Sequence, residues 1–488
     1  MSYKLLPFRF RRLGDKILLI NETGQFHCVN EPELYLLVNN RLDENTTLFN
    51  DFLCKDFISL DYTFATIDRI ATQYRTKKRF LFDSTALHMF VVTQRCNQKC
   101  LYCHASSEDD IALARDMPPD IGRKCTELAF ESPSPDIKIE FQGGEPLLNF
   151  QTIIAIVEHA EKLNAYYNKD LSFVLCSNLL QINDDHLEFL KKHNISISTS
   201  LDGAELEHNS CRKATNNAGS FSRVSANIAR AQNCLGKENV SALMTVTCLN
   251  INKLDETLDT YLAHGLTSIF PRMLNPFGRA ATQWARLAYP LDKYLEAYFA
   301  LFQRIMTLNY SGTYFVEEMA RILLRKILTP FDDGYVDIQS PSGAGISAIV
   351  YEIDGKVFLS DEARMYYKTT LDERFCLGNA LASKRSELFA RQAFANVLRN
   401  SVLETLPGCS WCAYLPYCGT DPIRNYATQG DMVSHKAFDD SCKFMRAVLD
   451  MLFENLLSND EHIHDIFWSW ITQRPYHEIN LGQHREAL

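Results

Sequence analysis

Three cysteines, Cys96, Cys100 and Cys103, lie within eight residues and follow an apolar, strand-like stretch at 87–92. Thiolate sulfur is a soft metal ligand, and three thiolates on one short loop can wrap one face of an iron–sulfur cube. A four-iron cube needs four ligands, so three cysteines leave one iron open, as in a reactive metal centre. The alternative is a zinc knuckle or reduced buried thiols, but zinc sites favour paired C-x2-C units.

A second motif, Gly143-Gly144-Glu145-Pro146, follows a strand-like run at 137–142. Paired glycines at the end of a strand let the backbone approach a ligand closely. A carboxylate at the same place can accept hydrogen bonds from an ammonium group. The two motifs therefore predict a metal centre beside a site for an amine.

The C-x3-C-x2-C spacing, with GGEP at the end of the next strand, resembles the radical S-adenosylmethionine (SAM) enzymes. The resemblance implies a 4Fe–4S cluster on the cysteine triplet that passes an electron to SAM. This step gives methionine and a 5′-deoxyadenosyl radical, which takes a hydrogen atom from an unactivated carbon. It also implies that Gly143, Gly144 and Glu145 hold the amino group of the SAM methionine.

Four further residues are expected near SAM. Ser200 and Arg212 match positions that contact the SAM ribose and carboxylate in radical SAM enzymes with cysteine-rich C-terminal extensions. From the residues alone, Ser200 could instead cap a helix or turn, and Arg212 could form a surface ion pair. Asn178, which ends the third strand, faces the same rim and is expected to touch SAM. Tyr102 is expected to pack against adenine, with a core aromatic as the alternative.

Strands and helices alternate between about 85 and 275. Six βα units in series predict an α/β fold with a parallel sheet that curves into a partial (β/α)6 barrel, with ligands at the carboxyl ends of the strands. Both motifs lie at such ends. The strand-like runs are 88–93, 137–142, 171–177, 195–201, 239–247 and 267–272.

The N-terminal residues predict a small separate α+β module with three strands and then helices near 32–41, 45–56 and 64–76. This order resembles the peptide-recognition elements of enzymes that modify ribosomal peptides, which bind a leader peptide as an added strand at a sheet edge. Alternatively, the module merely packs on the catalytic domain. The expected divisions are a winged-helix-like module (1–84), the radical SAM barrel (85–284), a helical bridge (285–340), a SPASM-like domain (341–448) and a helical tail (449–488).

A second cysteine set, Cys409-x2-Cys412-x5-Cys418 with Cys442 further on, supplies four thiolates. It resembles the SPASM extension of radical SAM peptide maturases, which can carry two auxiliary clusters. The resemblance implies one auxiliary 4Fe–4S cluster here, fully ligated by these four cysteines. A structural zinc ion on the same ligands is the alternative.

The chain departs from the SPASM pattern at three positions. Ser342, Ser360 and Pro422 stand where that pattern has cysteines, and the missing cysteines ligate the first auxiliary cluster in the family. Cys376 is left over, either inert or a substitute ligand. Asp361 stands where some members keep an acid that takes a proton from substrate; a solvated loop carboxylate is the alternative.

Composition narrows the functional class. The chain has 488 residues and a net charge of −10, which disfavours nucleic acid or an anionic membrane as the main partner. The N-terminus lacks the apolar core of a signal peptide, and no eighteen-residue apolar run predicts a membrane span. Fifteen cysteines without an export signal indicate cytosolic thiols, so we expect a cytoplasmic protein.

Runs at 6–10, 91–103, 417–422 and 426–431 are similar to the His-Xaa-Ser system radical SAM maturases. This resemblance implies oxidation, such as cross-linking, of side chains in a ribosomally made precursor peptide. The implied partners are that peptide, an electron donor such as flavodoxin or ferredoxin, and a partner maturase as an option. The alternatives are a formylglycine-generating sulfatase-type maturase, a small-molecule radical SAM enzyme and a non-catalytic iron–sulfur redox or scaffold protein.

Overall fold

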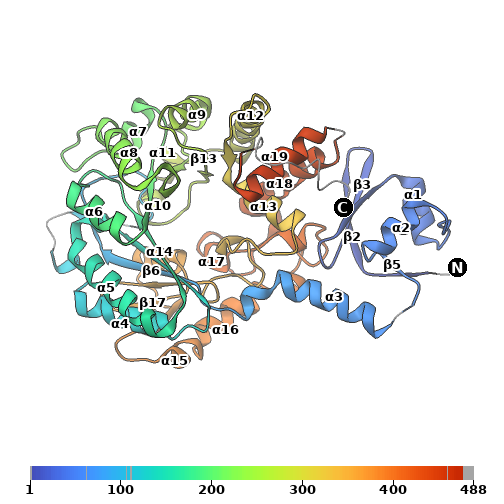
Figure 1. Ribbon diagram of the computed structural model, residues 1–488, viewed down its shortest axis with the longest axis horizontal. Helices are drawn as coiled ribbons and strands as arrows, with labels where there is room; N and C mark the ends of the chain where they lie inside the picture. Colours follow the sequence, from blue (N-terminus) through green and yellow to red (C-terminus); the bar gives the residue numbers. More distant parts are fainter. Residues whose placement is uncertain (1–2, 62, 106, 110–112, 459, 476–488) are drawn as a thin grey trace.

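A nine-stranded sheet runs through the body of the molecule in the order β14-β12-β11-β10-β9-β6-β16-β17-β18. The computed structural model describes residues 3–475 except 62, 106, 110–112 and 459 (Figure 1). The strands of this sheet are β6 (Leu87–Thr93), β9 (Asp136–Gly143), β10 (Asp170–Cys176), β11 (Ile195–Ser200), β12 (Val240–Thr245), β14 (Pro271–Arg272), β16 (Ala348–Tyr351), β17 (Lys356–Phe358) and β18 (Cys376–Asn379).

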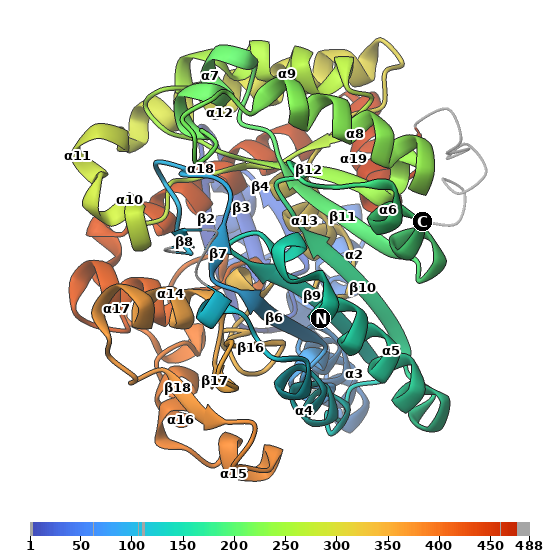
Figure 2. The same ribbon diagram turned by 90° about the vertical axis from the view of Figure 1, so that its left-hand side faces the viewer.

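The strands from β14 to β16 pair in parallel, and β6, β9, β10, β11, β12 and β14 follow one another along the chain. The predicted α/β fold with a partial barrel is therefore confirmed. Helices cover the outside of this sheet (Figure 2). They are α4 (Pro119–Phe130), α5 (Phe150–Tyr167), α6 (Asp184–Lys192), α8 (Phe221–Leu235) and α9 (Leu254–Ala263).

The strand that leads into the cysteine triplet, β6, is buried from Phe90 to Thr93. Its neighbour β9 buries Ile137, Ile139 and Phe141. A parallel strand with both faces covered reads as a nearly continuous apolar run, which β6 supplies, whereas β9 alternates buried apolar residues with polar ones. Burial of these residues fixes where β6 and β9 end along the sheet. It therefore also fixes the positions of the cysteine triplet and the GGEP motif.

The N-terminal module contains the antiparallel sheet β2-β3-β4 and the pair β1-β5. It lies at one end of the long axis (Figure 1). The helices begin close to the predicted positions, and Asn30, Thr46 and Thr63 cap them with side-chain oxygens. The elements are β1 (Lys4–Leu5), β2 (Phe8–Leu13), β3 (Lys16–Asn21), β4 (Phe26–Val29), α1 (Glu31–Val38), α2 (Thr47–Cys54), β5 (Ile58–Ser59) and α3 (Phe64–Lys77).

The C-terminal extension joins the barrel through backbone hydrogen bonds. Strand β16 pairs in parallel with β6, and β17 and β18 continue the same sheet in antiparallel fashion. The sequence did not predict this addition. The remaining elements of the bridge, extension and tail are α12 (Leu291–Tyr310), β15 (Val316–Glu317), α13 (Glu318–Leu328), α14 (Asp361–Thr370), α15 (Arg385–Phe389), α16 (Gln392–Arg399), α17 (Pro422–Gln429), α18 (Asp440–Leu456) and α19 (Glu461–Thr472).

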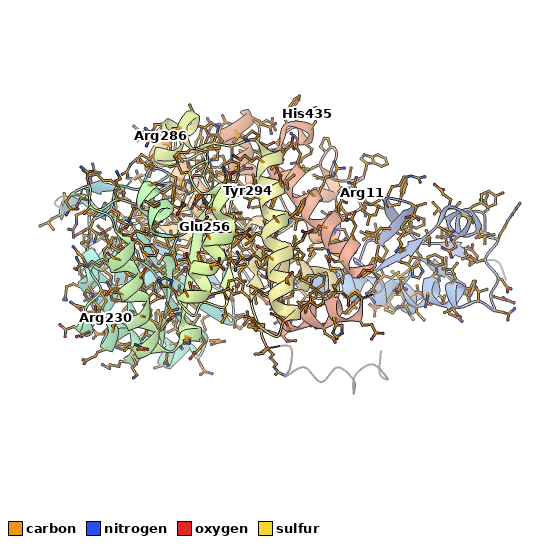
Figure 3. All side chains as sticks on the ribbon, turned by 90° about the horizontal axis from the view of Figure 1, so that it is seen from above. Arg11, Arg230, Glu256, Arg286, Tyr294 and His435 are labelled. Atoms are coloured by element: carbon orange, nitrogen blue, oxygen red, sulfur yellow. The ribbon has the colours of Figure 1, made fainter. Side chains whose placement is uncertain are left out.

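The N-terminal module docks on this extension. Arg11 on β2 donates from Nε and Nη2 to the carboxylate of Asp450 on α18, at 2.9 and 2.5 Å. Arg11 lies at the junction between the module and the red helices (Figure 3). Arg9, two residues earlier on the same strand face, donates to the carbonyl of Ser410 at 2.8 Å. Ser410 lies between Cys409 and Cys412, so the module contacts the second cysteine set directly.

Candidate active site

The cysteine loop begins where β6 ends, through the short strand β7 (Arg95–Cys96). Arg95 donates from Nε and Nη2 to the carboxylate of Asp116, at 2.8 and 2.7 Å. This bidentate ion pair fixes the residue before the first cysteine. Cys96 and Cys100 are buried, whereas Cys103 is half-buried.

The cysteine thiols influence one another electrostatically. Burial raises the pKa of Cys96 above its ordinary value, and the nearby Cys100 thiol raises it further. Burial also raises the pKa of Cys100 to about 11, an effect that Arg212 opposes. Such thiols ionise when a metal cation replaces the proton, so the site suits a positively charged centre.

No group of three or more His, Cys, Asp or Glu side chains in the described residues is arranged to hold a single metal ion.

The paired glycines after β9 allow two loops to cross. A Cβ atom on Gly143 would lie 2.2 Å from the carbonyl oxygen of Thr93, and one on Gly144 would lie 2.0 Å from that of Arg95. The Gly144 N–H donates to Thr93 O at 2.8 Å, and the Glu145 N–H donates to Arg95 O at 2.7 Å. The two glycines thus let the GGEP loop pass close to the backbone that leads into the cysteine loop, in addition to any ligand. This contact places the two motifs side by side.

Glu145 is fully buried behind the two glycines. Its carboxylate accepts from Ser177 Oγ at 2.7 Å and from the backbone N–H groups of Asn178 and Leu147, at 2.8 and 3.1 Å. Burial raises its pKa, and these hydrogen bonds oppose the rise. Because two carboxylate oxygens offer about four acceptor positions, one position remains for an ammonium group. Glu145 thus joins the end of β9 to the end of β10.

Asn178 connects the end of β10 to the cysteine loop. Its Nδ2 donates to Asn97 Oδ1 at 2.7 Å and approaches Cys96 Sγ at 3.8 Å. Ser200, the last residue of β11, and Asn178 both line the same cavity. The structure therefore places both residues at the rim where SAM contacts were predicted.

Arg212 is placed by backbone pairing with the cysteine loop. The Lys99 N–H donates to Lys213 O at 2.8 Å, and the Leu101 N–H donates to Cys211 O at 2.9 Å. These bonds bring the segment after α7 (Glu205–Cys211) against a loop that lies about a hundred residues earlier. Arg212 thereby enters the cysteine site.

The Arg212 guanidinium and Tyr102 form a buried network. Arg212 Nη1 donates to the Tyr102 hydroxyl at 2.6 Å, and that hydroxyl donates to Asp202. Burial and the Asp202 carboxylate raise the pKa of Tyr102, so the phenol keeps its proton. Tyr102 also packs in a small apolar cluster with Cys211 and Leu274. Its contacts therefore position Arg212, while its ring still borders the cavity.

Three buried donors in this network have no hydrogen-bond partner among the described residues. They are Asn97 Nδ2, Gln98 Nε2 and Arg212 Nε. Gln98 and Arg212 line the cavity, and each residue is at least nine-tenths buried. Buried donors in native structures are nearly always satisfied, so these atoms indicate a ligand that presents acceptors, such as a carboxylate. The residues present fit the polar groups of SAM.

One cavity of about 450 Å³ joins the two cysteine sets. Phe270, Tyr294 and Phe444 contribute apolar surface to its wall, and Figure 3 shows Tyr294 on α12. The cavity brings together thirteen of the residues expected from the sequence; Glu145 and Cys412 lie behind its wall. The thirteen are Cys96, Cys100, Cys103, Tyr102, Gly143, Gly144, Asn178, Ser200, Arg212, Asp361, Cys409, Cys418 and Cys442.

The second cysteine set gathers from two segments. Burial raises the pKa of Cys409 to about 11, with contributions from Cys442 and Cys412. Burial also raises the pKa of Cys418, and the other three thiols add to the rise. Cys442 lies in the first turn of α18 and the other three cysteines precede α17, yet Cys409, Cys418 and Cys442 line one cavity.

The residues that replace SPASM cysteines have local structural tasks. Ser360 caps α14, its Oγ accepting from the Ala363 N–H at 3.3 Å. Ser342 Oγ accepts from the Ala344 N–H at 3.3 Å, and Pro422 is the first residue of α17. Cys376 lies on β18, with its sulfur 3.5 Å from two backbone carbonyl oxygens.

Asp361 lines the cavity but is engaged by an arginine. Its Oδ1 accepts from Nε of the fully buried Arg364 at 2.9 Å. The next residue, Glu362, also lines the cavity, and burial with the nearby carboxylates of Asp337 and Asp421 raises its pKa well above the ordinary value. Glu362 is thus a second acid–base candidate beside Asp361.

Sequence reasoning missed several residues of the site. Gln98 lies between Cys96 and Cys100, and Asp202 lies two residues after Ser200. Both therefore lie in or beside segments from which the sequence already predicted site residues. Arg272 ends β14, the sixth barrel strand. A rule that inspects every polar residue at the carboxyl end of a barrel strand would have found it.

Residues 90–261 match the model of the Radical SAM superfamily. This segment is a radical SAM domain. It contains the cysteine triplet, the GGEP loop, Ser200 and Arg212. The described residues include no helix that is both long and apolar enough to cross a membrane.

The radical SAM domain has similar curated relatives. It is 29% identical over 187 residues to an uncharacterized protein of Methanocaldococcus jannaschii, covering 38% of this chain. It is 29% identical over 223 residues, 42% of this chain, to the radical SAM cyclopropyl synthase TigE of Paramaledivibacter caminithermalis. It is 27% identical over 140 residues, 28% of this chain, to a cysteine-type anaerobic sulfatase-maturating enzyme of Clostridium novyi. The matches span 61%, 43% and 37% of these relatives' lengths.

Solved structures share the fold over most of the chain. A histidine-tagged anSMEcpe with bound AdoMet has a TM-score of 0.65 at 19% identity, covering 80% of this chain and 99% of that one. Streptococcus suis SuiB bound to precursor peptide SuiA has a TM-score of 0.53 at 13% identity, covering 90% of this chain and 100% of that one. At these identities the likeness concerns the fold alone.

Proposed function

We propose that this protein is a radical SAM enzyme that oxidatively modifies, by cross-linking, side chains of a ribosomally made precursor peptide. The observation that carries the proposal is the single cavity. It receives the three-cysteine loop, the unpartnered donors of Gln98 and Arg212, and the second cysteine set. A redox sensor or scaffold has no use for a ligand pocket between its two metal centres.

Cys96, Cys100 and Cys103 would hold a 4Fe–4S cluster with one iron left for SAM. When bound, the cluster and SAM supply a one-electron cleavage whose radical product abstracts hydrogen from an unactivated carbon. The protein residues orient the cofactor. Arg212 and Gln98 present donors suited to the SAM carboxylate, and Gly143 and Gly144 border the cavity where the SAM amino group would lie. Glu145, buried behind them, holds the ends of β9 and β10 together.

Cys409, Cys412, Cys418 and Cys442 would hold one auxiliary 4Fe–4S cluster. A cluster with four protein thiolates has no open iron, so its role is electron transfer and stapling of the extension. Three of the four cysteines border the cavity, which suits removal of the second electron from a substrate held there. An electron donor such as flavodoxin or ferredoxin would supply the first electron.

The N-terminal module would bind the leader of the precursor peptide. Its three-stranded sheet has β2 and β4 as edge strands, and an extended peptide can add to such an edge through backbone hydrogen bonds. The contacts of Arg9 and Arg11 with the extension tie β2 to the auxiliary cysteine loop. A leader held on this module would therefore keep the core of the peptide near the cavity.

The proposed substrate is a peptide with His-Xaa-Ser repeats, because the runs at 6–10, 91–103, 417–422 and 426–431 are similar to the maturases of that system. SuiB, one of the similar structures, is described with a bound precursor peptide. The second candidate is a sulfatase-type maturase, favoured by the likeness to a sulfatase-maturating enzyme. Ser342 and Ser360, engaged in local hydrogen bonds where the first auxiliary ligands would stand, weigh against it.

Two assays test the proposal. Anaerobic incubation with dithionite and SAM should release 5′-deoxyadenosine from the reconstituted wild type, and Cys100→Ala should release none. Co-expression with a His-Xaa-Ser repeat peptide should lower the peptide mass by two hydrogens for each cross-link. If deoxyadenosine forms but the peptide mass does not change, the proposed radical SAM activity stands and the proposed peptide substrate is rejected. No deoxyadenosine at all would reject the enzyme.

A further inference from the structure

A lysine lies beside the second cysteine set. Lys436 precedes α18, and its Nζ donates to Ser434 Oγ at 2.8 Å and to Thr420 Oγ1 at 3.4 Å. The lysine stem packs on the backbone just before Cys409, because a Cβ atom on Gly408 would lie 3.4 Å from Lys436 Cγ. The ammonium is therefore held in one place by both neighbouring segments.

The side chain of Lys436 is only 14% exposed, and it lines the cavity with Cys409, Cys418 and Cys442. Water screens such a charge much less than one on the surface. Lys436 and three of the four cysteines therefore face the same enclosed space.

One carboxylate faces this ammonium. Asp439 Oδ2 lies 3.4 Å from Lys436 Nζ, and Asp439 Oδ1 lies 3.9 Å from Arg424 Nη1. Asp439 Oδ1 also accepts from the backbone N–H groups of Ser441 and Cys442, which caps α18. Two cations thus share the Asp439 carboxylate, so Asp439 does not neutralise Lys436 alone.

We propose that Lys436 sets the reduction potential of the auxiliary centre, holding it higher than four cysteine ligands alone would. Reduction adds one negative charge to a cluster that is already anionic on its thiolates, so a fixed ammonium stabilises the reduced form more than the oxidised form. In this role Lys436 acts through the cluster. The inference rests on the auxiliary cluster of the proposed function.

The test uses the full-length chain with Cys96, Cys100 and Cys103 changed to alanine, which leaves only the auxiliary centre. An anaerobic redox titration followed by electron paramagnetic resonance gives the midpoint potential. Lys436→Met should make reduction about tenfold less favourable, a fall of about 59 mV for one electron. Lys436→Arg keeps the charge and should stay close to the parent. Lys443→Met, which removes a 47% exposed lysine one residue after Cys442, should leave the potential unchanged.

The inference is overturned if Lys436→Met shifts the potential no more than Lys443→Met does. It is also overturned if Lys436→Arg shifts it as far as Lys436→Met, because the charge would then not be the cause. Should Lys436→Met not assemble the centre, Lys436→Gln is titrated against the same criterion. A parent chain with no reducible iron–sulfur signal would instead reject the auxiliary cluster itself, and with it this inference.

Discussion

The crossing of the GGEP loop and the cysteine loop makes Gly144→Ala a sharp test of the site. A methyl group on residue 144 would lie 2.0 Å from the carbonyl oxygen of Arg95 and 2.5 Å from its carbonyl carbon. Both atoms belong to backbone, so no flexible side chain can move aside. The variant must push the two loops apart, which moves Cys96 because it follows Arg95 directly.

The cost can be estimated from the contacts that separate. Overpacking in a tight interior costs about 1–3 kcal/mol. The two backbone hydrogen bonds that cross the loops, Gly144 N–H to Thr93 O and Glu145 N–H to Arg95 O, contribute about 1 kcal/mol each. The docked arrangement of the loops should therefore lose about 3–5 kcal/mol. This loss corresponds to a population about a hundredfold to several thousandfold lower.

The assay is iron content with electron paramagnetic resonance after anaerobic reconstitution. Gly144→Ala should lose the N-terminal cluster, about half of the iron, and with it 5′-deoxyadenosine formation, while the auxiliary cluster is retained as an internal control. Gly312→Ala is the control for backbone strain away from the site, since its φ is +89° but its added methyl group meets no atom within 4 Å. Full iron content and undiminished SAM cleavage in Gly144→Ala would refute the assigned role of this crossing.

Three further predictions concern binding and stability. Arg212→Met should weaken SAM binding about ten- to a hundredfold, because a hydrogen bond to a charged group contributes about 1.5–3 kcal/mol. Arg230→Met removes an exposed ion pair and should leave the dissociation constant for SAM unchanged. Equal effects of the two substitutions would contradict a specific contact between Arg212 and SAM. Arg11→Ala should lower the free energy of unfolding by about 0.5–1 kcal/mol in chemical denaturation, and adding Asp450→Asn should cost nothing more, whereas additive losses would exclude their coupling. Burial raises the pKa of Glu317 to about 7, so between pH 4.5 and 7 the folded chain binds a proton that the unfolded chain has released. The free energy of unfolding should therefore fall over this range, by up to about 3 kcal/mol, and Glu317→Gln should remove that part of the slope; an unchanged slope would refute the shift.

The grouping of the N-terminal cysteines with the GGEP loop was predictable because these residues are local in sequence. Cys96, Cys100 and Cys103 share one loop, and GGEP ends the next strand, so spacing and the βα alternation place them together. The partial barrel followed from the same alternation and is confirmed. Asn178 and Ser200 could be placed because each ends a barrel strand.

What the sequence could not supply are contacts between distant segments. Arg212 reaches the site through backbone pairing with the cysteine loop, and nothing in its neighbourhood in the sequence indicates that partner. The need for two glycines at 143–144 comes from the carbonyl groups of another loop. Nor does composition reveal that β16 adds to β6, because four apolar residues are compatible with many sheet positions. These features depend on tertiary packing rather than on local pattern.

The pairing of β16 with β6 has a practical result for dissecting the molecule. A shortened chain that stops after α13 would leave residues 87–90 of β6 without backbone partners on one side, in the strand that leads into the first cysteine loop. An unprotected border of that kind recruits other chains, so the catalytic half should precipitate when expressed alone. The C-terminal extension is therefore an integral part of the barrel sheet. The barrel and the extension are best studied by point substitutions in the full-length chain.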